Sequence, residues 1–227
     1  MIKLQRLAST SIISPTDNWW ESQFVFNPAA TIYQDKVILL YRAVGGDHIS
    51  RFGLATSSDG VSFQRQKDPI FESDPNNPLE RLGVEDPRIV FLGGEYLINY
   101  TGVSVYATKE AKELTWQRKI PWKVRSFLTK TQDFKNFTHE ELIFNKDQKD
   151  LALFPEKLNG QYCMLVRIYP DICLCYSTDM KTWSEPQKVL TTRENFWDSE
   201  RIGSGSPPIR TDFGWLHFYH GVDARSV

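Results

Sequence analysis

Short apolar runs alternate with polar turns along the chain, and no convincing amphipathic helix interrupts them. One turn pattern occurs three times, with a Ser or Thr, then an Asp, then an aromatic residue. The copies are Ser57-x-Asp59-x3-Phe63, Thr131-x-Asp133-x3-Phe137 and Ser177-x-Asp179-x3-Trp183. Because an apolar run lies on each side of every copy, the pattern predicts a hairpin turn between two strands. We expect the Asp to stabilise the turn rather than to act in catalysis.

A second hairpin pattern alternates with the first and occurs four times. Each copy has a Pro, an apolar strand, a turn, and a second strand that ends in a polar residue. The copies run from Asn27-Pro28 to Arg42, Asp86-Pro87 to Thr101, Phe154-Pro155 to Arg167, and Pro207-Pro208 to His220. Two successive hairpins make a four-stranded meander, which is one blade of a β-propeller. The sequence therefore predicts an all-β protein of the propeller class.

The repeats divide the chain into three blades and the first hairpin of a fourth. We expect one propeller domain over 1–227, with blade repeats at about 23–73, 84–145, 152–191 and 203–227. The charged segment 107–123 is expected to be a loop inserted in the second repeat. Three and a half blades leave sheet edges uncovered. The interpretation is a shortened form of a longer propeller, or a ring that another chain completes.

Composition and charge are ordinary for a soluble globular protein. Of 227 residues, 41% are hydrophobic and 24% are charged, and the net charge is -1, so nucleic acid and membrane partners are not expected. No apolar run approaches the roughly 20 residues that span a bilayer. The three cysteines, Cys163, Cys173 and Cys175, fit neither a disulfide framework nor a zinc site. We expect buried free thiols and a cytoplasmic location.

The ends of the four Pro-containing hairpins are expected to converge at one mouth of the central channel. This geometry nominates Asp86, Arg42, Arg167 and His220 as site residues. Adjacent side chains on a strand point to opposite faces, so Glu85 is not expected to act as a facing partner of Asp86. A carboxyl deep in a narrow channel is expected to have a raised pKa, which suits a general acid.

Four ordered segments resemble a known family. They are FNPAATIYQDKVILLYR, GVEDPR, LFPEKLNGQYCMLVR and ERIGSGSPPIRTDFGWLHFYHGV. Together they resemble glycoside hydrolase family 130, which comprises β-mannoside phosphorylases and related β-mannosidases on a five-bladed propeller. The resemblance runs from about residue 23 to residue 227 and implies a five-bladed type of which about three and a half blades are present.

The resemblance also implies roles for individual residues. Asp86 matches the family's general acid, which protonates the glycosidic oxygen through the 3-hydroxyl of the mannosyl unit while phosphate attacks with inversion. Inorganic phosphate is then the co-substrate, with no cofactor and no metal. The implied substrate-binding residues are Asn27, Arg42, Glu85 and Arg88, although an ion pair in the scaffold is the simpler interpretation of Glu85 and Arg88. The implied phosphate-binding residues are Lys149, Arg167, Arg201 and His220.

Several functions remain open from the sequence. The first is inverting phosphorolysis of β-mannosides to α-mannose 1-phosphate, with an oligosaccharide and phosphate as partners; the basic residues favour it. A β-mannosidase that uses water, and a non-catalytic sugar-binding propeller or inactive fragment, are the alternatives. Glycosidases for arabinan or fructan need two or three carboxylates, and only Glu156 and Asp198 could join Asp86. The acceptor sugar, the linkage and assembly into a homo-oligomer are left open.

Overall fold

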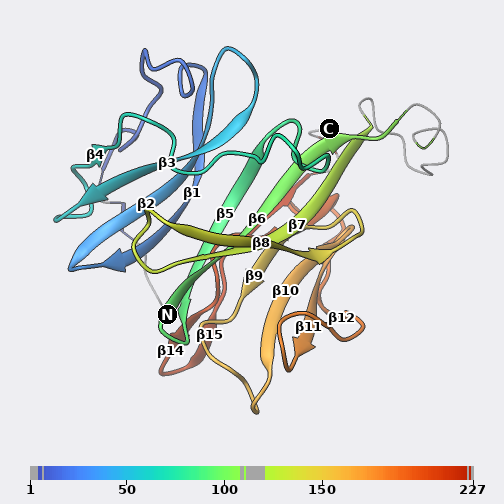
Figure 1. Cartoon of the computed structure of the whole chain (residues 1–227). Helices are drawn as coiled ribbons and strands as arrows, with labels where there is room; N and C mark the ends of the chain where they lie inside the picture. The colour runs from blue at the N-terminus through green and yellow to red at the C-terminus, as the bar shows by residue number, and fades with distance from the viewer. Residues whose placement is uncertain (1–4, 7, 108–109, 111–120, 224, 226–227) are drawn as a thin grey trace.

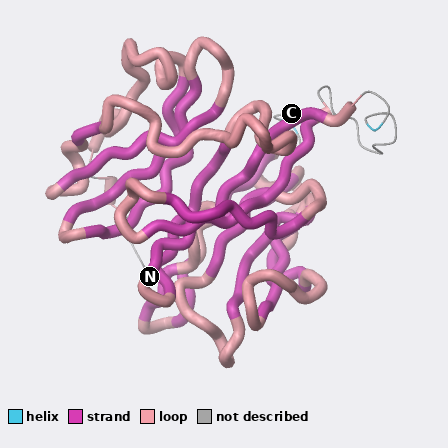
Figure 2. The backbone as a smooth tube through the Cα atoms, in the orientation of Figure 1, coloured by secondary structure: helices cyan, strands magenta, loops and turns pink. Residues whose placement is uncertain are grey.

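The computed structural model describes residues 5–6, 8–107, 110, 121–223 and 225, and its named elements are all β-strands (Figures 1 and 2). Three antiparallel four-stranded sheets follow one another along the chain, each with its strands in sequence order. The first sheet contains β1 (Phe24–Tyr33), β2 (Lys36–Val44), β3 (Ser50–Ser57) and β4 (Gln64–Arg65). The second contains β5 (Val84–Leu92), β6 (Glu95–Val105), β7 (Trp122–Thr131) and β8 (Phe137–Phe144). The third contains β9 (Lys149–Leu153), β10 (Tyr162–Ile168), β11 (Asp171–Ser177) and β12 (Gln187–Leu190).

The last part of the chain forms two smaller sheets. They pair β13 (Arg201–Ser204) with β16 (Tyr219–Val222), and β14 (Ile209–Thr211) with β15 (Gly214–Leu216). Figure 1 shows the second sheet between the first and the third, as in successive propeller blades. The propeller class is confirmed, and in the part of the chain that the structure describes the sheets do not close into a ring. Most of the expected inserted loop at 107–123 lies outside the described residues.

The three repeated turns are built as the sequence predicts. In the first, Asp59 Oδ1 accepts hydrogen bonds from the backbone nitrogens of Val61 at 2.8 Å and Ser62 at 2.7 Å. Asp133 and Asp179 accept the same pair of backbone hydrogen bonds in the second and third turns. The turn role of these aspartates is therefore confirmed.

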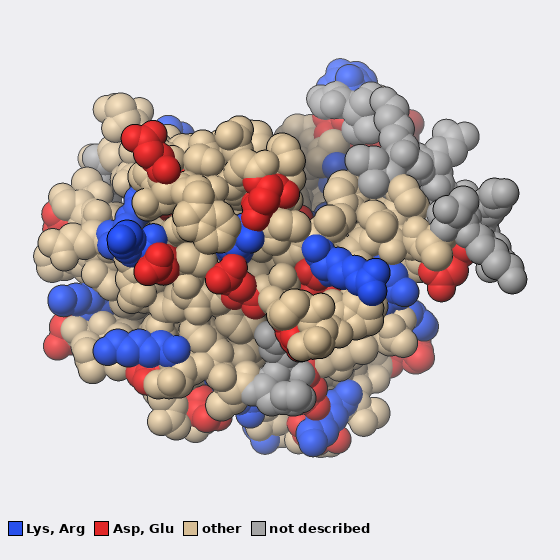
Figure 3. Space-filling model, turned by 45° about the horizontal axis from the view of Figure 1, so that its top comes forward, with Lys and Arg blue, Asp and Glu red and all other residues tan. Residues whose placement is uncertain are grey.

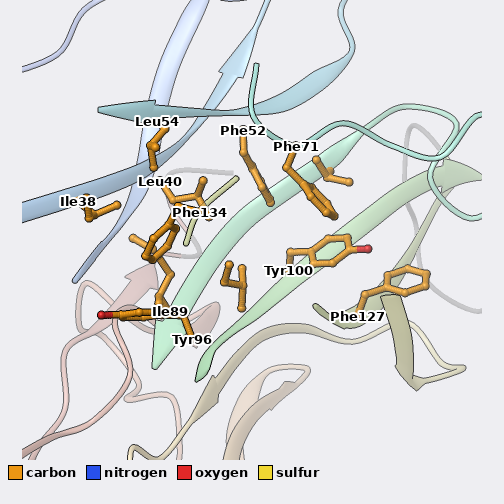
Figure 4. Packing of buried hydrophobic residues seen from close by; sticks show 13 residues of the cluster. Ile38, Leu40, Phe52, Leu54, Phe71, Ile89, Tyr96, Tyr100, Phe127 and Phe134 are labelled. Atoms are coloured by element: carbon orange, nitrogen blue, oxygen red, sulfur yellow. The ribbon is translucent and has the colours of Figure 1, made fainter. Parts of the chain in front are cut away.

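Apolar clusters join each sheet to the next. The cluster between the first and second sheets includes Leu40, Phe52, Ile98, Tyr100 and Phe134 (Figure 4). A second cluster joins the second and third sheets, and a third joins the third sheet to the last part of the chain. The three cysteines are buried in these two clusters as free thiols, as predicted, and burial raises the pKa of Cys175 to about 12.

The sequence-based placement of the third Pro-containing hairpin along the chain is wrong, and that of the fourth is right only in part. In the third, β9 ends just before Phe154-Pro155, where the sequence predicts a strand to begin, and Phe154 packs edge-to-face on Trp215. In the fourth, Pro207-Pro208 directly precedes β14, and β14 and β15 form the predicted hairpin, but β16 with His220 pairs with β13 instead. In the first two sheets the Pro stands inside the strand at a bulge, so Pro marks different positions in different sheets.

Charged residues of both signs are interspersed on the face drawn in Figure 3, in keeping with the net charge of -1. Among the residues that the structure describes, no helix is long and apolar enough to cross a membrane.

Candidate active site

A repeated irregularity in the first strand of each four-stranded sheet builds the site. Asn27, Asp86 and Asp150 all have left-handed backbone conformations, with φ of 47°, 53° and 60°. The strand register shifts at each of these positions. Asn and Asp tolerate this conformation better than most residues. The bulges therefore place one polar side chain from each sheet against a common cavity.

The cavity has a volume of about 540 Å³ and is lined by residues from all three sheets and the last part of the chain. The lining residues that the sequence predicted are Asn27, Asp86, Arg88, Lys149, Arg167, Arg201 and His220. Arg42 and Glu85 do not line it, but both contact residues that do. The structure thus brings the predicted substrate-binding and phosphate-binding residues together in one place.

Asp86 is held by three polar partners. Its carboxylate accepts a hydrogen bond from Asn27 Nδ2 at 2.8 Å and forms ion pairs with Arg42 Nη1 at 3.2 Å and Lys149 Nζ at 2.9 Å. Burial alone would raise its pKa, but the charges of Lys149 and Arg42 and the Asn27 hydrogen bond lower the pKa well below the ordinary value. The expected raised pKa is therefore wrong, because the two cations outweigh burial.

Glu85 shares the two cations with Asp86. Lys149 Nζ lies 2.7 Å from Glu85 Oε2, and Arg42 Nη2 contacts Glu85 Oε1. The expectation that the adjacent carboxylates lie apart on opposite faces is wrong, because the left-handed bulge at Asp86 breaks the strand alternation. The four side chains form a compact network of two carboxylates and two cations. Lys149 keeps its charge, since these carboxylates raise its pKa against the opposing effect of burial.

Arg167 and His220 face a different carboxylate, that of Asp150. Arg167 Nη1 lies 2.8 Å and His220 Nε2 lies 3.5 Å from Asp150 Oδ2. The His220 side chain is 51% exposed, and its pKa is lowered mainly by partial burial and by Arg167 and Arg88, against the effect of Asp150. Arg201 also lines the cavity, and the three basic side chains are suited to an oxyanion.

Arg88 links the second sheet to the last part of the chain through hydrogen bonds. Its guanidinium donates to the backbone oxygens of Gly205 at 2.7 Å, of Ser204, and of Asp86 at 3.1 Å. It also pairs with Asp150 Oδ1 at 3.1 Å. These contacts agree with the ion-pair interpretation of Arg88 from the sequence, and the side chain also lines the cavity.

Sequence reasoning missed Asp150 and two serines. The sequence pattern begins the third hairpin at Phe154, four residues after Asp150, and so leaves Asp150 outside it. An Asn or Asp at each first-strand bulge is the signal that could identify it. Ser204 and Ser206 line the cavity, and their buried hydroxyls have no hydrogen-bond partner among the described residues. No sequence signal distinguished these serines from others.

The two other carboxylates that the sequence considered do not line the cavity. Glu156 is exposed, and Asp198 is buried against Arg193 and Tyr219. Within the described ranges, no group of three or more His, Cys, Asp or Glu residues could hold a metal ion.

Comparison with known proteins identifies a matching family and two similar enzymes. The model of glycoside hydrolase family 130, described as beta-1,4-mannooligosaccharide phosphorylase, matches residues 8–227. The chain is 36% identical to a 1,2-beta-oligomannan phosphorylase from Thermoanaerobacter sp. (strain X514), covering 100% of this chain and 74% of that protein. It is 33% identical to a beta-1,2-mannobiose phosphorylase from the same organism, and this match covers 100% of this chain and 75% of that protein.

Solved structures show the same fold. The beta-1,2-mannobiose phosphorylase from Listeria innocua, solved with beta-1,2-mannobiose, superposes with a TM-score of 0.73. The identity is 24%, and the match covers 89% of this chain and 69% of that one. At this identity the likeness concerns the fold alone.

Proposed function

Since the chain belongs to glycoside hydrolase family 130, we propose that it is an inverting phosphorylase that converts β-mannosides and inorganic phosphate to α-mannose 1-phosphate. The observation that carries the proposal is one cavity lined both by Asp86 and by the basic residues Arg167, Arg201 and His220. The first suits protonation of a leaving group, and the second suits a phosphate ion.

In the proposed reaction, a phosphate oxygen attacks the anomeric carbon of the mannosyl unit as the glycosidic bond breaks. The configuration inverts, and the leaving oxygen takes a proton that Asp86 supplies through the sugar's 3-hydroxyl. A single acid suffices because phosphate is already a nucleophile, whereas inverting hydrolases need a second carboxylate to activate water. The basic residues that line the cavity balance the charge of phosphate and orient the ion for attack.

Asp86 has to gain a proton before it can act. In the free protein Lys149 and Arg42 lower its pKa. A phosphate dianion in the same cavity offsets the field of these cations and adds a nearby negative charge, and both effects raise the pKa of a carboxyl. We propose that Asp86 becomes an acid only once phosphate and sugar are bound, so that protonation is coupled to assembly of the substrates.

We propose β-1,2-linked mannosides as the first substrates to test. The two relatives described above, at 36% and 33% identity, are named for β-1,2-linked substrates. A β-1,4-mannooligosaccharide phosphorylase from Ruminococcus albus is less similar, at 29% identity. A cytoplasmic location and assembly into a homo-oligomer stay predictions.

The test incubates the protein with β-1,2-mannobiose or β-1,4-mannobiose, with and without phosphate, and follows the products by phosphorus and proton NMR. We expect α-mannose 1-phosphate only when phosphate is supplied. Free mannose in its absence would instead indicate the β-mannosidase, and no turnover of any mannoside would indicate a binding protein.

The variant Asp86→Asn removes the proposed acid while keeping the side-chain shape. We expect kcat to fall by about 10²- to 10⁴-fold, the usual contribution of a general acid. Circular dichroism should show an intact fold. The matched control is Asp59→Asn, which changes a turn aspartate that does not line the cavity. An unchanged rate in Asp86→Asn would exclude the proposed role.

A further inference from the structure

We infer that Asp150 is a positioning residue for phosphate, because it holds Arg167 and His220 in the orientation that receives the ion. The inference rests on the proposed function of the same cavity. Asp150 is the third member of the bulge series that includes Asn27 and Asp86. The first two members supply polar groups to one network, whereas Asp150 turns to a different set of partners.

The backbone explains how Asp150 reaches these partners. Its φ of 60° and the register shift opposite it, between Leu165 and Arg167, take it out of the regular strand alternation. The side chain is 4% exposed, so its charge is almost wholly removed from water. A buried carboxylate is costly unless basic partners compensate it. The partners of Asp150 are therefore part of what keeps this arrangement in place.

Three basic groups from three different strands converge on the Asp150 carboxylate. Arg88 of β5 contacts Oδ1 at 3.1 Å. Arg167 of β10 and His220 of β16 contact Oδ2 at 2.8 Å and 3.5 Å. Without the carboxylate the guanidinium groups of Arg88 and Arg167 would repel one another, and His220 Nε2 would lose the carboxylate oxygen that lies 3.5 Å from it.

Gly203 supports the same contact from the neighbouring strand. A Cβ at this position would lie 2.3 Å from Asp150 Oδ2 and 2.7 Å from Cε1 and Nε2 of the His220 ring. Its φ is not in the left-handed region, so the close approach of the side chains, and not the backbone conformation, favours glycine here. The space that a Cβ would fill is the space in which Asp150 and His220 meet.

The geometry leaves the basic groups able to bind an oxyanion. Arg167 uses one nitrogen for Asp150, and a guanidinium carries five N–H donors. A fixed guanidinium loses less entropy when phosphate binds than a mobile one. The negative charge of Asp150 itself opposes phosphate, so positioning and plain electrostatics predict opposite signs for its removal.

The variant Asp150→Asn distinguishes the two effects, because it removes the charge of the side chain and keeps its shape. Binding of inorganic phosphate is measured by titration calorimetry, and KM for phosphate and kcat are measured with β-1,2-mannobiose. We expect the Kd and KM for phosphate to rise about tenfold or more, which is the effect of losing one charge-assisted contact between a displaced Arg167 and the ion. We expect kcat at saturating phosphate to change far less.

Two further variants separate positioning from general damage. Gly203→Ala keeps every charge but crowds the Asp150–His220 contact, and it should raise the same two constants. Asp171→Asn is the matched control, since Asp171 is also buried and paired with a lysine in the third sheet but does not line the cavity. It should lower the melting temperature without changing phosphate binding.

Phosphate binding that is unchanged or tighter in Asp150→Asn would overturn the inference, as would an equal loss in Asp171→Asn. If Asp150→Asn does not fold, the change in phosphate affinity of Gly203→Ala decides instead. Calorimetry measures phosphate binding without turnover, so the inference about Asp150 can be tested independently of the proposed reaction. Wild-type protein that binds phosphate but makes no mannose 1-phosphate refutes the proposed function alone, whereas wild-type protein that binds no phosphate refutes the inference as well.

Discussion

At the scale of single residues, the charge of Asp86 is set by its neighbours rather than by its depth. The side chain is 11% exposed, which by itself favours the neutral acid. Two cations within 3.2 Å reverse this preference. The sequence could place a carboxyl at this point but could not show that Lys149, 63 residues away in the chain, lies against it. Local sequence carries no information on such long-range ion pairs.

Lys149 is the cation whose replacement tests this account. In Lys149→Met we expect the pKa of Asp86 to rise, because burial is then opposed only by the charge of Arg42 and the Asn27 hydrogen bond. We also expect kcat/KM for phosphate to fall about tenfold or more with the loss of a charged contact. The pKa is measured by carboxyl carbon NMR, with the signal assigned from Asp86→Asn.

The sign of the accompanying stability change follows from linkage. A carboxyl whose pKa is lower in the folded than in the unfolded state stabilises the protein at pH values above its unfolded pKa. This stabilisation is lost as the pH falls toward the folded-state pKa. In Lys149→Met the stabilisation contributed by Asp86 is smaller, so the free energy of unfolding should depend less on pH below about 4. Lys149→Arg is the control that keeps the charge. An unchanged pKa of Asp86 in Lys149→Met would contradict the account.

At the scale of strands and turns, the sequence predicted regular features well and irregular ones poorly. The Ser/Thr-x-Asp turns were predictable because each is a local hydrogen-bonding unit, with its donors within three residues. The bulges at Asp86 and Asp150 were not, because alternation of side chains is the rule that a bulge breaks. The site is built from those exceptions, so it was the harder part to predict.

Gly83 leads into the bulge at Asp86, and its replacement tests how tightly that segment is constrained. Its φ is +100°, and a Cβ would lie 2.2 Å from the backbone oxygen of Ser50. We expect Gly83→Ala to cost about 3 kcal/mol or more in the free energy of unfolding, through strain and through displacement of the first sheet. Activity should also fall, because Asp86 would move with the segment.

Gly93 is the matched control for Gly83. It also has a positive φ, of +67°, but a Cβ there would meet no atom within 4 Å. Gly93→Ala should therefore cost only about 1 kcal/mol, the penalty of the left-handed conformation. Urea unfolding compares the two variants, and equal losses would mean that contact with Ser50 has no effect.

At the scale of the whole molecule, the propeller class was predictable because repetition survives errors in individual strands. Four copies of one hairpin indicate blades even though the third is misplaced along the chain and the fourth matches only in its first strand and turn. The order in which the sheets pack was also implicit, since successive blades of a propeller are neighbours. The cavity was not predictable in detail, because its walls combine residues from β1 to β16.

Stability is expected to be uneven across the sheets. The last part of the chain is paired only in two-stranded sheets of short strands, and many of its side chains are partly exposed. The second sheet, by contrast, is packed on both sides by apolar clusters. We therefore expect amide hydrogen exchange to be faster in residues 201–222 than in β5 and β6.

Arg88 is the side chain that should control this difference, because its guanidinium donates to the backbone of Ser204 and Gly205. In Arg88→Met we expect exchange in residues 201–222 to rise about tenfold or more, as charge-assisted hydrogen bonds are lost. Arg51→Met is the matched control, since Arg51 is equally buried and paired with two carboxylates within the first part of the chain. If both variants accelerate exchange in residues 201–222 equally, the contacts of Arg88 are not what holds these strands in place. If only Arg88→Met does, Arg88 joins the second sheet to the last strands and so also holds Arg201 and His220 at the cavity.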